Sequence, residues 1–133
     1  MSVRQVIQTH PQPTPLDRDV LARCITECVE CAAVCTGCAD ACLAEADVQQ
    51  LVRCIRLCLD CSDICSTAQR VLTRQTAADL GVLRAVAETC ATACRTCGDE
   101  CARHATHHEH CRVCAESCRR CVEACDAFVA AMN

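Results

Sequence analysis

Aromatic residues are almost absent from this chain of 133 residues, which contains no tryptophan or tyrosine and a single phenylalanine, Phe128. A core filled by leucine and phenylalanine in the usual proportion is therefore excluded. Glycine and proline are also scarce, with three of each, which is too few for a loop-rich fold held by disulfides. The long stretches between them favour helix, and the chain length suits one domain with a modest core.

Several functional classes lack the features that they require. The net charge of −4 argues against a nucleic-acid partner, because nucleic-acid-binding proteins normally have a basic face. Residues 1–18 contain neither the apolar segment of a secretory signal nor a twin arginine, and no stretch is long enough to cross a bilayer. No Ser/His/Asp set or carboxylate pair suggests catalysis. We therefore expect a cytoplasmic protein without enzymatic activity and without a nucleic-acid or membrane partner.

Cysteine is abundant, with 19 residues, and the odd number excludes complete pairing within one chain. In a reducing cytosol so many cysteines indicate metal or redox chemistry rather than structural disulfides. They fall into four groups, and every gap inside a group is three or four residues, in strict alternation. This spacing places side chains on one stripe of a helix. The cysteines are Cys24, Cys28, Cys31, Cys35, Cys38, Cys42, Cys54, Cys58, Cys61, Cys65, Cys90, Cys94, Cys97, Cys101, Cys111, Cys114, Cys118, Cys121 and Cys125.

Each group contains the phrase C-x3-C-x2-C-x3-C, and each follows a segment that resembles a helix-capping box. These boxes begin at Thr14, Asp47, Thr76 and Thr106. Together the two signals predict helices over 15–45, 48–74, 77–104 and 107–131. Short connections make sequential helices antiparallel, so we predict an all-α, up-down-up-down four-helix bundle with a Cys-lined core. The bundle domain covers 14–133, after an N-terminal arm over 1–13 with one short helical turn.

The two ends of the predicted bundle differ in chemistry. Continuing the cysteine stripe in the four helices reaches a set of apolar residues at one end, which we call the plug: Leu21, Leu72, Leu83 and Phe128. At the other end, which we call the mouth, the stripes reach His104, His107 and His108, with Asp47 nearby. These three histidines are candidate metal ligands. We expect His110, which is off the stripe, and His10, in the arm, to face solvent.

The stripe chemistry favours copper(I). Thiolates are soft ligands, which select Cu(I), Zn(II) and iron–sulfur clusters. Each Cu(I) that displaces one thiol proton leaves the core neutral, whereas Zn(II) with four thiolates leaves a buried charge of −2, which is costly. Cysteines three or four apart on a helix have Cβ atoms about 5–6 Å apart, so we expect such pairs to bind low-coordinate ions linked by bridging sulfurs. The stripe from Cys24 to Cys42 spans roughly 27 Å, enough for a column of many Cu(I) ions.

Other readings of the cysteines are weaker but not all excluded. A core of small residues would be built more safely from alanine, and disulfides within a helix have poor geometry. A thioredoxin-like role would need one C-x2-C pair with a special environment, whereas six such pairs are present. The alternative that remains is a metal–sulfur redox protein with iron–sulfur clusters, although these clusters are usually ligated from irregular loops.

The four phrases at 24–35, 54–65, 90–101 and 114–125 resemble the copper storage proteins, and in particular their cytosolic branch. The resemblance covers roughly residues 15–131. It implies a cysteine-lined four-helix bundle, copper–thiolate clusters along its interior and a homotetramer. It also implies His or Met ligands near the open end, where His104, His107 and His108 fit by position and Met1 and Met132 do not.

Overall fold

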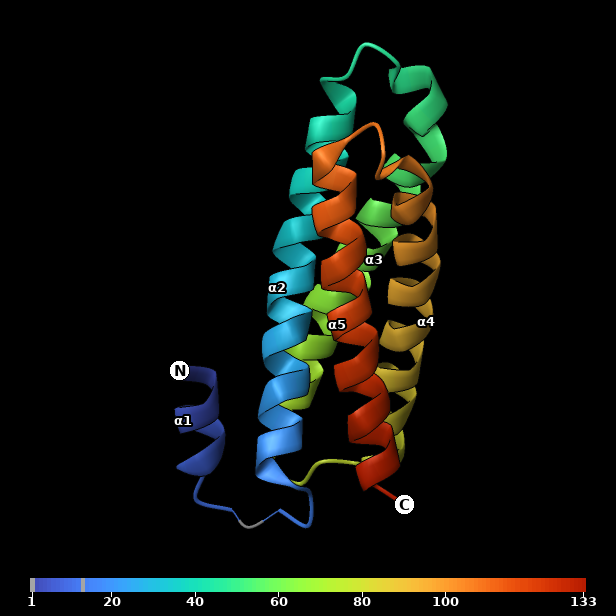
Figure 1. The fold of residues 1–133 in the computed structure, drawn as a ribbon. Coiled ribbons are helices and arrows are strands. Elements are labelled where there is room, and N and C mark those ends of the chain that lie inside the picture. The colour runs from blue at the N-terminus through green and yellow to red at the C-terminus, as the bar shows by residue number, and fades with distance from the viewer. Residues whose placement is uncertain (1, 13) are drawn as a thin grey trace.

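Four long helices run alternately up and down, and a short N-terminal helix lies against the first of them (Figure 1). The computed structural model describes residues 2–12 and 14–133. Neighbouring helices are α2 with α3, α3 with α4, α4 with α5, and α5 with α2. The predicted all-α antiparallel bundle is therefore confirmed. In chain order the elements are α1 (Ser2–Gln8), α2 (Arg18–Leu43), the 3-10 helix η1 (Val48–Leu51), α3 (Val52–Thr73), α4 (Leu80–His104) and α5 (Glu109–Ala131).

Two of the long helices begin three residues later than their predicted capping boxes. Asp17 caps α2 by accepting hydrogen bonds from the backbone N–H groups of Asp19 and Val20, at 3.0 and 3.1 Å. Asp79 caps α4 in the same way, by accepting a hydrogen bond from the backbone N–H of Val82 at 3.0 Å. The prediction assigned these aspartates to the third helical position. A short carboxylate is itself a preferred N-cap, so the threonine three residues earlier stays outside the helix.

The other two predicted boxes are also wrong. Asp47 precedes η1 and makes no side-chain capping bond, and the α-helical part of this segment begins only at Val52. His108 occupies the cap position of α5, again without a side-chain bond to the helix. Both side chains instead bond to each other, at 3.0 Å between His108 Nε2 and Asp47 Oδ2. The capping signal was therefore a sound indicator that a helix starts, and a poor one of its first residue.

The core consists mainly of cysteine, closed at one end by larger apolar side chains. All nineteen cysteines are at most 2% exposed. The plug residues Leu21, Leu72, Leu83 and Phe128 are equally buried, and all lie at the end where α2 and α4 begin. Nothing in the described helices combines the length and the apolar character needed to cross a membrane.

The N-terminal arm covers the plug end. Ile7 of α1 is 2% exposed and packs on the core, and α1 stands beside the lower part of α2 (Figure 1). There Gln12 Oε1 accepts the backbone N–H of Ala77 at 3.1 Å, and His10 Nε2 lies 3.3 Å from Thr76 Oγ1. The expectation that His10 faces solvent is therefore wrong, since it is half-buried against the loop between α3 and α4.

Helices α4 and α5 approach closely at one glycine. A Cβ atom placed on Gly98 would lie 3.1 Å from Cys118 Cβ, a tighter contact than side chains normally make. Glycine at this position therefore lets the two backbones come together beside the cysteine column. Any larger residue at position 98 would push Cys118 away from the opposite helices.

Candidate metal centre

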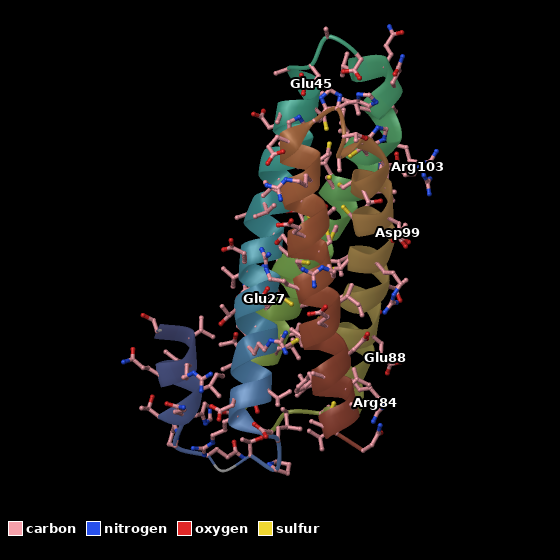
Figure 2. The ribbon with its side chains drawn as sticks, viewed as in Figure 1. Glu27, Glu45, Arg84, Glu88, Asp99 and Arg103 are labelled. Atoms are coloured by element: carbon pink, nitrogen blue, oxygen red, sulfur yellow. The ribbon has the colours of Figure 1, made fainter. Side chains whose placement is uncertain are left out.

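The cysteine side chains form one column of sulfur atoms along the axis of the bundle. All nineteen are free thiols, and Figure 2 shows sulfur atoms between the helices along the bundle. The heptad spacing explains this placement, because it keeps one stripe of each helix turned towards the other three. The sequence prediction of a Cys-lined interior is thereby confirmed.

Most sulfur–sulfur contacts join different helices. Along α2 and α5, Cys24 contacts Cys125 at 3.6 Å and Cys35 contacts Cys114 at 3.6 Å. Along α3 and α4 the shortest contact is 3.5 Å, between Cys65 and Cys94. Contacts also cross the diagonals of the bundle, for example 3.7 Å between Cys28 and Cys90. Each thiol therefore has neighbours on other helices that a soft ion can share.

Pairs within one helix are less important than the spacing suggested. The sulfur–sulfur hydrogen bonds inside a single helix join residues four apart, at 3.7 Å for Cys31 and Cys35 and 3.9 Å for Cys61 and Cys65. A third such bond, at 4.0 Å, joins Cys97 and Cys101. None of the six C-x2-C pairs makes such a bond in the described chain, whereas these three C-x3-C pairs do. The sequence led us to expect ion-binding pairs at both spacings, and the contacts within one helix show only the spacing of four residues.

Groups of four sulfurs follow one another along the column and overlap. In each group the four Sγ atoms lie within 4.8 Å of one another. Cys31 belongs to two of these groups, and so do Cys35, Cys118 and Cys121. A sulfur shared by adjacent groups can bridge two metal ions. The arrangement therefore suits a continuous chain of ions better than separate tetrahedral sites. The groups include 28/90/121/125, 31/65/94/121, 31/35/61/118, 35/97/114/118 and 38/54/58/101.

Two cysteines near the mouth, Cys42 and Cys111, have pKa values that favour the neutral thiol. Burial raises the pKa of the Cys111 thiol to about 12 and raises the pKa of the Cys42 thiol as well. A metal ion binds the thiolate, so an ion that enters here must displace a proton. An ion of charge +1 that displaces a single proton would leave the buried charge unchanged.

Of the three predicted histidine ligands, His104 is the one whose position suits the column best. It follows Cys101 by one helical turn and is partly buried, with 21% of its side chain exposed. Its Nε2 atom lies 2.7 Å from Glu100 Oε2. His107 lies in the turn between α4 and α5 and is exposed.

His108 has both ring nitrogens occupied by carboxylates. Nδ1 lies 2.6 Å from Glu45 Oε2, and Nε2 lies 3.0 Å from Asp47 Oδ2. The bond to Asp47, together with the nearby charge of Glu45, raises the pKa of His108 and favours the imidazolium. An imidazolium has no free lone pair, so His108 binds a metal only after it gives up a proton and one carboxylate.

His110 is the histidine that the sequence prediction missed. Its Nδ1 atom lies 3.4 Å from Cys38 Sγ and 3.7 Å from Cys111 Sγ, and its Nε2 lies 2.9 Å from Glu45 Oε2. The expectation that it faces solvent is wrong, because it begins a flank of α5 that packs on α2. The sequence held one signal for the buried position of His110. The residues seven and fourteen positions later, Ser117 and Ala124, share its heptad position and are small, and both are buried.

Comparison with known proteins gives consistent matches. The family profile for copper storage proteins, Csp, matches residues 17–130. The copper storage protein Ccsp of Streptomyces lividans, solved with 10 copper equivalents, is 52% identical over 97% of this chain and 98% of its own, with a TM-score of 0.95. The same organism's cytosolic copper storage protein, solved with five coppers, is 56% identical over 84% of this chain and 93% of its own, with a TM-score of 0.83. Cu(I)-bound BsCsp3, a Bacillus subtilis copper storage protein, is 36% identical over 80% of this chain and 94% of its own, with a TM-score of 0.71.

Proposed function

The chain belongs to the copper storage protein family, and from this premise we propose that its sulfur column holds many Cu(I) ions at once in the cytosol. The observation that carries the proposal is the overlap of the four-sulfur groups, because the sulfurs that adjacent groups share, those of Cys31, Cys35, Cys118 and Cys121, let neighbouring ions be bridged along that part of the column. The related structures with several coppers or with Cu(I) support the same cargo. A redox protein with iron–sulfur clusters is not favoured by these relatives.

We propose all nineteen cysteines as ligands, together with His104 and His110 at the mouth. Both histidines are partly buried, and His110 already contacts Cys38 and Cys111. We leave His107 and His108 outside this set, because the first is exposed and the second is held by two carboxylates. The resemblance to the family also supports a homotetramer, and a storage role requires no catalytic step.

The capacity for Cu(I) tests this proposal. We expect anaerobic titration of the reduced protein with Cu(I), in competition with a chromophoric chelator, to reach a plateau near one ion per cysteine. The reason is that one Cu(I) replaces one proton and leaves the core neutral. A plateau at about four ions, the number that separate four-thiolate sites would hold, would contradict the bridged column.

A further inference from the structure

Glu100 is a buried carboxylate at the mouth of the bundle. It lies on α4 one turn before His104, and its side chain is only 8% exposed. Glutamate is seldom buried unless its charge is paired, because removing a carboxylate from water is costly. Its burial therefore indicates specific partners.

The shortest contact of Glu100 is with a histidine. Its Oε2 atom lies 2.7 Å from His104 Nε2, while Oε1 lies 3.5 Å from Arg53 Nε and 3.7 Å from Arg103 Nη1. The labelled Arg103 marks this end of the bundle in Figure 2. An ionised carboxylate only accepts hydrogen bonds, so Nε2 of His104 must carry the hydrogen.

The two arginines do not account for the position of Glu100. Their side chains are 69% and 75% exposed, and both distances exceed those of a good hydrogen bond. Exposed ion pairs of this kind contribute little to stability. The oxygen that makes the shortest contact of Glu100, Oε2, is the one that faces His104.

We infer that Glu100 is a positioning residue for copper uptake, which fixes the ring of His104 so that Nδ1 offers its lone pair to an arriving Cu(I) ion. This inference depends on the proposed role of His104 as a ligand. A carboxylate that accepts the second ring N–H of a ligating histidine sets both its tautomer and its orientation.

The neighbouring histidine shows the same arrangement. His110 directs Nε2 to a carboxylate, Glu45, and Nδ1 to the sulfurs of Cys38 and Cys111. Glu100 therefore contacts Nε2 of His104 on α4 as Glu45 contacts Nε2 of His110 on α5. In both imidazoles Nε2 contacts a carboxylate, and in His110 the other nitrogen, Nδ1, lies beside the thiols.

A double-mutant cycle with Glu100→Gln and His104→Ala tests the inference. The amide has the same shape but can donate or accept, so it no longer enforces one tautomer. We expect Glu100→Gln to slow Cu(I) transfer from a Cu(I)–bicinchoninate complex by about tenfold, the usual lower effect of removing such a partner. The same substitution in the His104→Ala background should change the rate by less than about twofold, because its target is gone. The exposed neighbour substitution Asp99→Asn removes the same charge and should have no effect.

Two further readouts keep the outcomes distinct. In the unsubstituted protein, ¹⁵N correlation spectra of the histidine rings should show the Nε2–H tautomer for His104, and an Nδ1–H tautomer would overturn the inference without any variant. If Glu100→Gln slows Cu(I) transfer equally with and without His104, Glu100 acts only as a member of a structural ion pair, and the inference is wrong. Total Cu(I) capacity should stay unchanged in the Glu100→Gln and Asp99→Asn variants, and it should fall by no more than about an ion or two where His104 is replaced. If the unsubstituted protein binds only a few ions, the storage column itself fails, whatever Glu100 does.

Discussion

The histidine side chains at the mouth differ in what their ring nitrogens contact. His110 contacts two sulfurs, whereas His107, three residues earlier, is exposed in the turn. Neutral imidazole binds Cu(I) less tightly than thiolate does, so a histidine beside the outermost thiols can receive an ion and pass it inward. The contact with two sulfurs should therefore make His110 important for exchange, whereas the exposed His107 should not be.

Replacing His110 by alanine should slow both uptake and release of Cu(I) by about tenfold, while the total capacity changes by no more than the ion or two that it contacts. The measurement is stopped-flow transfer of Cu(I) to and from a competing chelator. His107→Ala is the matched control and should exchange at the rate of the unsubstituted protein. Equal rates for the two variants would show that contact with Cys38 and Cys111 has no kinetic importance.

The spacing of residues along the sequence did not define the role of helix α1. The sequence placed a short helical turn in the arm, and α1 confirms it. The structure adds that the helix is docked, with Ile7 in the core and Val6, its neighbour, 55% exposed. The arm then reaches the loop between α3 and α4, where Ala77 has a φ of 53°, in the left-handed region. The hydrogen bond that the N–H of Ala77 donates to Gln12 Oε1 helps to hold this unfavourable backbone conformation.

Ile7→Ala should lower the free energy of unfolding of the metal-free protein by at least about 2 kcal/mol, because it removes a fully buried side chain. Val6→Ala, on the exposed side of the same helix, should change it by less than about 0.5 kcal/mol. Urea denaturation followed by circular dichroism measures both. If Ile7→Ala leaves the stability unchanged, the arm opens independently of the bundle, and its cover over the plug is only transient.

For the whole molecule, a core of neutral thiols has consequences for stability as well as for metal binding. We expect the reduced, metal-free protein to be fully helical at neutral pH, since buried neutral thiols are tolerated and the plug anchors one end. Zinc fingers, by contrast, need their ion to fold. Because Cys42 and Cys111 have raised pKa values, this stability should depend on pH in the alkaline range.

The direction follows from proton binding. Thiols of the unfolded chain ionise near pH 8.5, whereas the folded Cys111 thiol keeps its proton until a pH of about 12. The stabilisation that the buried neutral thiol gives the folded protein is therefore fully present below about pH 8.5. As the pH rises towards the folded pKa, the free energy of unfolding falls by about 1.4 kcal/mol per pH unit for each such thiol. Anaerobic urea denaturation at pH 7, 8.5 and 10 measures the loss. Stability that rises over this range would show that these thiols ionise more readily in the folded protein than in the unfolded chain.

The sequence by itself determined the bundle, its antiparallel order and the chemistry of its interior. The reason is that an alternation of three and four residues can be satisfied only by one stripe of a helix, and each of the four helices carries that stripe. The contrast between the plug of Leu21 and Phe128 and the histidines of the mouth followed from the same rule. These features depend on local periodicity, which is written in the order of residues along the chain.

Only the tertiary structure decided which atoms meet. Cβ spacing along one helix favoured partners within that helix, yet the sulfur of Cys24 contacts Cys125 and that of Cys65 contacts Cys94, because side chains in the axis reach across to other helices. Likewise, His110 lies beside Cys38 because the flank of α5 packs against α2, and Glu100 contacts both His104 on its own helix and Arg53 of α3. Contacts between helices depend on axial rotation and crossing geometry, which no spacing within a single helix specifies.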